Sequence, residues 1–261
     1  MYSFFAEESR FANIGLQKRD IAFYKTTDST NTRAREAFLA SQDDAPLLYV
    51  AEEQTAGRGT RGRSFESKKG GLYFSILYRP ESNDADVTGM TAIAAAAVFD
   101  ALSSLLGGDY HGRIFIKWVN DVYIEDKKIS GILCEKIDNG TDIAYVIGIG
   151  INVLSADLSP DVAKIAASVE DMTGISLDKE TLLYEILGRL ISALPPPCES
   201  PLAEIYRQHM LPCGTRITVT DASGNVREAE TVGLGADFSL LVRYENGESE
   251  SLISGDVRIK L

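Results

Sequence analysis

Cysteine is scarce in this chain of 261 residues, which contains three. Cys134, Cys198 and Cys213 are odd in number and show no C-x-x-C spacing, so the sequence indicates neither a disulfide framework nor a zinc site. No uninterrupted apolar run approaches the ~20 residues of a membrane helix. Residues 1–20 also lack the apolar core of a signal peptide. We therefore predict a soluble cytoplasmic protein with no membrane partner.

Positive charge is also lacking overall, since the formal net charge is -12 and the pI is about 4.7. Such a chain has no general surface for DNA or RNA, and none for an anionic membrane. Any nucleotide must then bind in a local pocket. The composition, 44% hydrophobic and 25% charged, is that of an ordinary globular protein with a proper core. The length allows one large domain, or a large and a small one.

One segment departs from this acidic character. Between Gln54 and Lys69, three arginines and two lysines face a single acid, Glu66. Three glycines, Gly57, Gly59 and Gly62, are interleaved with them and allow the backbone to approach a ligand closely. Arginine forks match carboxylate and phosphate oxygens. The segment predicts a site for a small, strongly anionic ligand. The alternatives are a solvated basic loop or an RGG-type nucleic-acid segment, which is usually longer and disordered.

The first half of the chain predicts alternating strands and helices. The expected strands are 21–25, 47–52 and 71–78, and the expected helices are 32–40 and 86–106. Asp28, Ser29 or Thr30 is the expected N-cap of the first helix. That helix start is either a simple cap or a place where spare hydroxyls and N–H groups hold a ligand. The second helix is apolar nearly all round and should be buried, and Gly107 ends it.

The second half predicts a hairpin-rich region followed by a small β-rich domain. The expected elements are strands and a hairpin over 113–136, a strand over 144–153, helices over 160–173, 179–194 and 200–210, and short strands from 215 to 261. Gly148 and Gly150 lie inside the 144–153 strand, where glycine often marks a close approach. Asn-Gly and Gly-Asn turns between the last strands are typical of a small β-barrel. We predict an α+β fold with domains 1–212 and 213–261.

Three strand ends carry side chains that match the chemistry of the basic segment. Lys117 and Asn120 lie in K-W-V-N-D, Lys128 lies in K-K-I-S-G, and Asn152 ends G-I-G-I-N. Each of them alone is ordinary, a surface lysine or a turn asparagine. Together they form a set of cations and amides that suits a nucleotide and a carboxylate substrate. Fixed positive charge at a reacting phosphate is what such a step needs most.

These motifs resemble the biotin–protein ligase family. The chain has G-R-G-T-R-G-R at 57–63, K-W-V-N-D at 117–121, K-I-S-G-I-L at 128–133 and G-I-G-I-N at 148–152, with D-S-T-N at 28–31 in the same order. The resemblance implies a mixed β-sheet domain packed with helices, of the class II synthetase-like type, and a C-terminal SH3-like barrel. It implies that biotin and ATP give biotinyl-5′-AMP, which then biotinylates a lysine of a biotin carboxyl carrier domain. It also implies Mg²⁺ on the ATP phosphates, without a metal site on the protein.

The resemblance further implies roles for individual residues. Lys128 and Arg58 are the expected catalytic cations, and both also contact biotin. The other expected biotin-binding residues are Ser29, Thr30, Asn31, Gln54, Gly57, Gly59, Thr60 and Gly131. The expected residues for ATP and the adenylate are Arg61, Arg63, Phe65, Lys117, Asn120 and Asn152.

The chain departs from the family pattern at three positions. Thr60 replaces the usual arginine, Val119 the usual proline and Phe65 a frequent tryptophan. The first of these predicts weaker retention of the adenylate. The short N-terminal region predicts the form without a DNA-binding domain. The alternatives are a lipoate or octanoate ligase on the same scaffold, a member that no longer turns over, or a non-catalytic biotin-sensing regulator. An edge-to-edge homodimer is common in the family.

Overall fold

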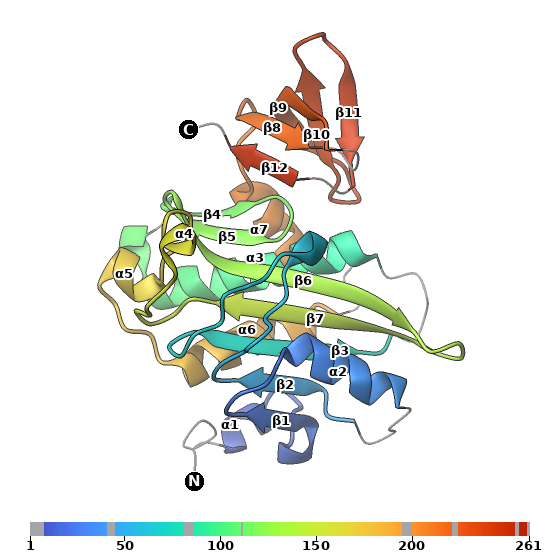
Figure 1. Cartoon of the computed structure of the whole chain (residues 1–261), viewed down its shortest axis with the longest axis vertical. Coiled ribbons are helices and arrows are strands. Elements are labelled where there is room, and N and C mark those ends of the chain that lie inside the picture. Colours follow the sequence, from blue (N-terminus) through green and yellow to red (C-terminus); the bar gives the residue numbers. More distant parts are fainter. Residues whose placement is uncertain are drawn as a thin grey trace.

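The computed structural model describes residues 8–40, 45–80, 86–110, 112–194, 200–220, 224–253 and 256–259. Among these, Cys134 is buried and Cys213 is exposed, and both are free thiols. Cys198 lies outside the described residues. The sequence expectation of strands and helices in a large N-terminal part, followed by a β-rich C-terminal part, is confirmed in the described residues (Figure 1).

A seven-stranded mixed sheet forms the centre of the larger part. Its order is β1-β2-β3-β7-β6-β5-β4. The strands are β1 (Ile21–Tyr24), β2 (Leu48–Ala51), β3 (Leu72–Tyr78), β4 (Ile114–Lys117), β5 (Asp121–Ile124), β6 (Lys127–Asp138) and β7 (Ile143–Ile151). Only the β1–β2 pair is parallel among the described strands. The central strands are almost continuously apolar, as expected for a sheet covered on both faces.

Helices cover both faces of this sheet. On one face, α3 (Val87–Leu106) packs against β4–β7 and against α6 (Lys179–Ser192) and α7 (Pro201–His209). On the other face, α2 (Thr30–Leu39) packs on β2, β3 and β7, and it lies in front of the sheet in Figure 1. The N-terminal helix α1 (Glu8–Ala12) is short.

Helix α3 has clear sequence limits. The Asp86 carboxylate accepts from the Gly89 N–H (2.9 Å) at its start, and Gly107, with φ 82°, ends it. By length and composition α3 could cross a membrane, but it is mostly buried in the protein core. It is the buried helix that its all-round apolar sequence predicts.

The predicted helix over 160–173 is wrong as a single element. The structure has two short helices instead, α4 (Pro160–Ala163) and α5 (Val169–Thr173). Between them, a turn at 164–165 leads into a short bridge with Lys128, whose N–H donates to Ile165 O (2.9 Å) and whose carbonyl accepts from Ala167 N–H (3.2 Å). Ser168 then caps α5 by accepting from Asp171 N–H (2.9 Å). Long-range pairing overrides the local helical pattern here.

The C-terminal part is a five-stranded antiparallel sheet in the order β11-β10-β9-β8-β12. Its strands are β8 (Arg216–Thr220), β9 (Val226–Leu234), β10 (Leu240–Tyr244), β11 (Ser249–Leu252) and β12 (Asp256–Ile259). Phe238 anchors it to the larger part, because its buried ring meets Tyr206 edge-on (5.6 Å) and its carbonyl accepts from the Trp118 indole N–H (2.8 Å). The hydrophobic core continues across this contact. The boundary at residue 212 therefore stays a prediction.

Candidate active site

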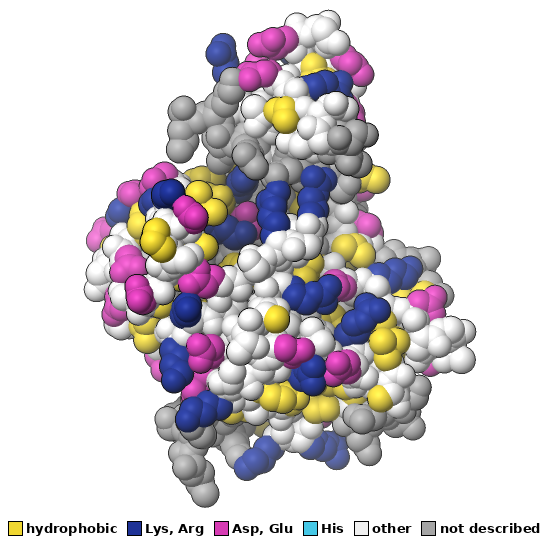
Figure 2. All heavy atoms as spheres, in the orientation of Figure 1, with side chains coloured by type: hydrophobic (Ala, Val, Ile, Leu, Met, Phe, Trp, Pro, Cys, Tyr) yellow, Lys and Arg dark blue, Asp and Glu magenta, His cyan; other side chains and the backbone are white. Residues whose placement is uncertain are grey.

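A cavity of about 570 Å³ opens on the face of the sheet that also carries α2. Its wall comes from the start of α2, the glycine-rich loop, strands β4–β7 with the turn between β4 and β5, the segment between α4 and α5, and one residue of β12. The lining residues are Ser29, Thr30, Asn31, Gln54, Arg58, Gly59, Thr60, Arg61, Arg63, Ser64, Phe65, Lys117, Trp118, Asn120, Asp121, Tyr123, Lys128, Gly131, Ile132, Leu133, Gly148, Ile149, Gly150, Ile165 and Val257. Lysine and arginine side chains gather across the middle of this face (Figure 2).

One end of the cavity, here called the helix end, is formed by Ser29, Thr30, Asn31 and Gln54. The first three are nearly fully buried at the start of α2. Ser29 is the N-cap residue, yet its side chain makes no capping hydrogen bond. The Gln54 side chain takes that role, since its Oε1 accepts from the Thr30 N–H (2.8 Å). The hydroxyl of Ser29 is thus not consumed by capping, which favours a ligand-binding role for this helix start over a simple cap.

A buried hydroxyl beneath the helix end holds these side chains in place. Ser75 of β3 is fully buried, and its Oγ lies 2.7 Å from Thr30 Oγ1 and 2.6 Å from Asn31 Oδ1. The Asn31 Nδ2 donates to Glu135 Oε2 (2.9 Å) and Leu133 O (3.2 Å), which leaves Oδ1 to accept from Ser75. Neither Ser75 nor Glu135 was expected from the sequence, because each is far along the chain from the residues it contacts.

Glycine at 148 is required by this packing. A Cβ on Gly148 would lie 1.9 Å from Asn31 Oδ1, so a side chain there would displace the asparagine. The close approach predicted inside this strand is therefore made by a side chain of the helix end. Gly150, two residues along on the same face, has the equivalent relation to Phe65, with a Cβ placed 2.8 Å from its ring.

The glycine-rich loop folds back on itself between Gly57 and Phe65. The Phe65 N–H donates to Gly57 O (2.9 Å), and the Gly59 N–H donates to Arg63 O (2.7 Å). The turn between them places Arg61 in the left-handed region (φ 58°), which is uncommon outside glycine. Gly57 itself lies outside the lining. Its role is steric, because a Cβ there would lie 2.3 Å from Phe65 O.

The base of the loop is tied together through Gln54. Its N–H donates to Ser67 O (3.1 Å), its Nε2 donates to Ser67 Oγ (2.8 Å), and Ser67 Oγ in turn donates to Phe65 O (3.0 Å). Phe65 then rests its ring against Gly131 and Gly150, 5.8 Å from Lys128 Nζ. The aromatic side chain expected on the nucleotide side thus lies beside the expected catalytic lysine.

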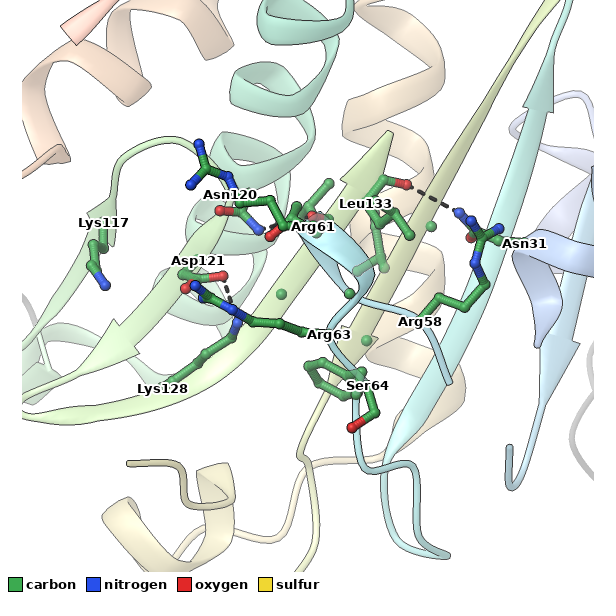
Figure 3. A pocket seen from close by; sticks show the side chains of 18 of the residues that line it. Asn31, Arg58, Arg61, Arg63, Ser64, Lys117, Asn120, Asp121, Lys128 and Leu133 are labelled. Atoms are coloured by element: carbon green, nitrogen blue, oxygen red, sulfur yellow. Dashed lines mark hydrogen bonds and ion pairs between the residues drawn. The ribbon is translucent and has the colours of Figure 1, made fainter. Parts of the chain in front are cut away.

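The opposite end of the cavity, here called the cation end, is formed by Arg61, Arg63, Lys117 and Lys128. Lys128 Nζ is 2.6 Å from Asp121 Oδ1, and Figure 3 shows Arg63 reaching towards the same pair. Asn120 is placed beside them by its Nδ2, which donates to Ile132 O (3.0 Å). Asp121 belongs to the K-W-V-N-D motif but was not singled out as a site residue.

Arg58 lies apart from the cation end. In Figure 3 its guanidinium rises beside Asn31, away from Lys128 and Arg63. There it donates from Nη1 and Nη2 to the two oxygens of Glu135 (2.9 and 2.8 Å). The two expected catalytic cations are therefore each paired with one carboxylate, Arg58 with Glu135 and Lys128 with Asp121.

The phenol of Tyr123 in the cavity wall has a shifted pKa. Burial raises the pKa of Tyr123 well above its usual range, and the charge of Asp121 adds to the shift. The hydroxyl therefore stays protonated at any physiological pH and can serve as a hydrogen-bond donor. Lys117 Nζ lies over the same ring, 5.7 Å from its centroid. Within the described residues, no group of three or more His, Cys, Asp or Glu side chains is arranged to hold a metal ion.

The structure brings together every predicted site residue except Gly57 and Asn152. Asn152 is buried beside β6, with its N–H on Ile129 O (2.9 Å) and its Nδ2 on Ala167 O (3.4 Å). It supports the segment that pairs with Lys128, and its role towards a nucleotide remains a prediction. Trp118, Tyr123, Ile165 and Val257 line the cavity without having been expected there.

Comparison with known proteins gives consistent results. The model of the Biotin/lipoate A/B protein ligase family matches residues 23–152. The chain is 34% identical to the biotin–[acetyl-CoA-carboxylase] ligase of Paracoccus denitrificans over 60% of its own length and 65% of that protein. It is 32% identical to the bifunctional ligase/repressor BirA of Bacillus subtilis over 92% of its own length and 74% of that protein. For the Escherichia coli ligase/repressor, the matched share of that protein is 53%.

The fold is likewise similar to a solved structure. The biotin protein ligase from Aquifex aeolicus in complex with biotin and ATP superimposes with a TM-score of 0.75 at 27% identity, covering 92% of this chain and 98% of that one. The expected class of fold, a mixed sheet with helices followed by a small SH3-like part, is confirmed.

Proposed function

The chain belongs to the biotin–protein ligase family, and from this premise we propose that it activates biotin with ATP and transfers it to a lysine of a carrier protein. The observation that carries the proposal is the division of one cavity into two chemically different ends. The helix end offers buried, uncharged hydrogen-bonding groups, which suit the ureido ring of biotin. The cation end offers fixed positive charge, which suits a triphosphate.

In the first step, an oxygen of the biotin carboxylate attacks the α-phosphorus of ATP, and the bond to the β-phosphate oxygen breaks. The products are biotinyl-5′-AMP and pyrophosphate. The two reactants repel each other, so cations at the meeting point lower the barrier. Lys128, in the cation end, is the residue proposed for that point. Arg58, which belongs to the glycine-rich loop, would contact the biotin carboxylate.

The nucleotide would lie over the cation end. Arg61, Arg63 and Lys117 would meet phosphate oxygens, Asn120 and Phe65 would lie along the adenosine, and the Phe65 ring would supply a stacking face. Mg²⁺ on the phosphates would neutralise further charge. Asp121 is already paired with Lys128. A Mg²⁺ ion would therefore be held mainly by the phosphate oxygens and by water.

In the second step, the ε-amine of a carrier lysine attacks the acyl carbon of the mixed anhydride, an amide forms, and AMP leaves. The proposed partner is the biotin carboxyl carrier domain of a biotin-dependent carboxylase. The intermediate is prone to hydrolysis, so exclusion of water matters. The glycine-rich loop at the cavity supports this role, because its backbone can close over a ligand.

The proposal is tested by incubating the protein with ATP, Mg²⁺, biotin and a purified carrier domain and weighing the carrier. We expect a mass increase of one biotinyl group that requires ATP. A parallel reaction with lipoate addresses the family's other substrate class. Preferential modification of the carrier with lipoate would mean that lipoate, and not biotin, is the substrate. Binding of biotin without any modified carrier would indicate a non-catalytic member.

Two further expectations belong to the same proposal. A cytoplasmic location fits the buried position of the one long apolar helix among the described residues. For a homodimer formed edge to edge, the strands at the edges of the central sheet are β1 and β4. Sedimentation with and without biotin and ATP would test the dimer.

A further inference from the structure

An acidic side chain lies beside a cavity proposed to bind two anions. Glu135 of β6 is largely buried, with 18% of its side chain exposed. Its carboxylate accepts from Arg58 through both oxygens and from Asn31 Nδ2 (2.9 Å). A fixed negative charge at this place weakens the attraction of the site for a carboxylate substrate. Its presence therefore needs a compensating role.

Arg58 has little else to hold it among the contacts of the described residues. It lies between Gly57 and Gly59 on a loop, and its side chain is 42% exposed. A long side chain on such a backbone loses considerable entropy when a ligand immobilises it. The pairing with Glu135 restricts the guanidinium before any ligand arrives. It uses two of the five guanidinium N–H groups and leaves three for a substrate.

Glu135 also orients Asn31. The amide could present either its oxygen or its nitrogen to Ser75. Because Nδ2 donates to Glu135 and to Leu133 O, the oxygen faces the Ser75 hydroxyl at 2.6 Å. One carboxylate thus joins the cation of the loop to the amide of the helix end. These two groups come from positions 27 residues apart in the chain, and Glu135 lies 77 residues beyond Arg58.

We propose that Glu135 is a positioning residue, which holds Arg58 and Asn31 in the geometry that receives the acyl substrate. The proposal rests on the proposed function. The opposing interpretation is that Glu135 occupies the place of the substrate carboxylate on Arg58 and competes with it. The two interpretations predict opposite signs for the same substitution.

Glu135→Gln provides the test. The change removes a negative charge, keeps an oxygen for Asn31, and turns an NH₂ group towards Arg58. Under positioning, the dissociation constant for biotin, measured by calorimetry without ATP, rises about tenfold, the size expected for one lost charge-assisted hydrogen-bond pair. The KM for ATP at saturating biotin changes less than about threefold. Under competition or simple charge repulsion, biotin binds more tightly.

Glu135→Asp and a matched control complete the design. Aspartate keeps the charge but retracts it by one methylene, so positioning predicts weakened biotin binding here too, whereas a pure charge effect predicts none. The control is Glu125→Gln, which releases Arg113 from a comparable pair (2.7 Å) outside the cavity. It should leave biotin binding unchanged. Equal weakening in Glu125→Gln and Glu135→Gln would overturn the proposal.

The coupling with Arg58 gives a readout that general destabilisation does not produce. In a double-mutant cycle with Arg58→Lys, the two losses should be clearly less than additive, because the lysine has already lost the forked pairing. Additive losses would overturn the proposal. If the unaltered protein fails to bind biotin, the proposed function itself fails. If it binds and Glu135→Gln binds equally well or better, only the role of Glu135 fails.

Discussion

The two ends of the cavity differ in how their side chains are held. At the helix end, Thr30, Asn31 and Ser75 are buried and bonded to one another. At the cation end, Arg61 and Arg63 are exposed on a turn of the glycine-rich loop. The first end is organised before a ligand binds, whereas the second can adapt to one.

This difference suits the two proposed substrates. A small uncharged ring is distinguished by donors and acceptors in fixed positions, since a misplaced partner leaves a buried polar group unsatisfied. A triphosphate is long, flexible and strongly charged, so cations on an adaptable backbone can meet it in more than one way. Four measurements would break or sharpen this comparison, in order of decreasing expected effect.

The largest effect is expected at Lys128 of the cation end. Lys128→Ala should lower biotin-dependent pyrophosphate release by at least about 10²–10³-fold, because the fixed charge at the reacting phosphate is lost. Biotin binding without ATP should change much less. Pyrophosphate release and calorimetry measure the two quantities.

The control for Lys128→Ala is Lys136→Ala, on the same strand but over the ring of Tyr145 (5.9 Å) and outside the cavity. It should retain normal turnover. A circular-dichroism melt establishes whether Asp121, left without its lysine, destabilises the fold. Normal turnover of a folded Lys128→Ala variant would remove the lysine from the mechanism.

The second effect belongs to the helix end alone. Ser75→Ala removes the hydroxyl beneath Thr30 and Asn31 and should raise the KM for biotin about tenfold, with the KM for ATP nearly unchanged. The matched control is Ser130→Ala, since Ser130 is equally buried but donates to Gly150 O (2.8 Å). Both variants should be less stable than the unaltered protein, but only Ser75→Ala should show a raised KM for biotin. A similar rise in the KM for biotin and the KM for ATP in Ser75→Ala would show that the two ends are not independent.

The third effect is on salt dependence. Raising the ionic strength from about 0.05 M to about 0.5 M should raise the KM for ATP several-fold, because exposed charges are screened within a shorter distance. The KM for biotin should rise less, since biotin carries one negative charge against several on ATP and its ring contacts are uncharged. Steady-state titrations at constant Mg²⁺ would measure both. Equal salt sensitivity for the two substrates would contradict the proposed division.

The smallest effect concerns Asp28, just before α2. Burial opposes ionisation of its carboxyl, but hydrogen bonds from Ser29 N–H, Arg33 and Thr27 outweigh burial and lower its pKa from the usual 3.8. A lowered pKa in the folded state stabilises the protein above pH 3.8, and this contribution disappears as the pH falls through the folded-state pKa.

Asp28→Asn should therefore lower the free energy of unfolding at pH 7 by less than about 1 kcal/mol. The melting temperature should fall slightly as a result. The difference from the unaltered protein should shrink as the pH falls below 3.8. Melting curves between pH 3 and pH 7 would measure it. A constant difference over that range would mean that the ionised carboxylate is not what stabilises the start of α2.

Many of the cavity residues could be predicted from short motifs, because the glycine-rich loop and the strand ends each contain their cationic and amide side chains within a few consecutive residues. The pairings could not. Lys128 meets Asp121 only because β6 runs antiparallel to β5, with a register shift between Val122 and Tyr123. No local pattern in the sequence determines that register.

The same reason explains the other omissions. Glu135 and Ser75 lie on strands whose neighbours are set by sheet order, so a sequence pattern shows them only as a surface acid and a buried serine. The break near residue 165 has a similar origin, since the helical pattern there loses to pairing with Lys128. Local chemistry was predictable, whereas contacts that depend on tertiary order were not.

The tie between Gln54 and Ser67 has a mechanical consequence. It joins the two ends of the glycine-rich loop by hydrogen bonds, and Gln54 also accepts from the Thr30 N–H at the start of α2. Any movement of the span from Gly57 to Phe65 over a ligand would therefore leave both ends of the loop and the start of α2 in place. Under the proposed function, the residues that would bind the biotin ring at the start of α2 and the loop that would cover the nucleotide are connected through one side chain, Gln54.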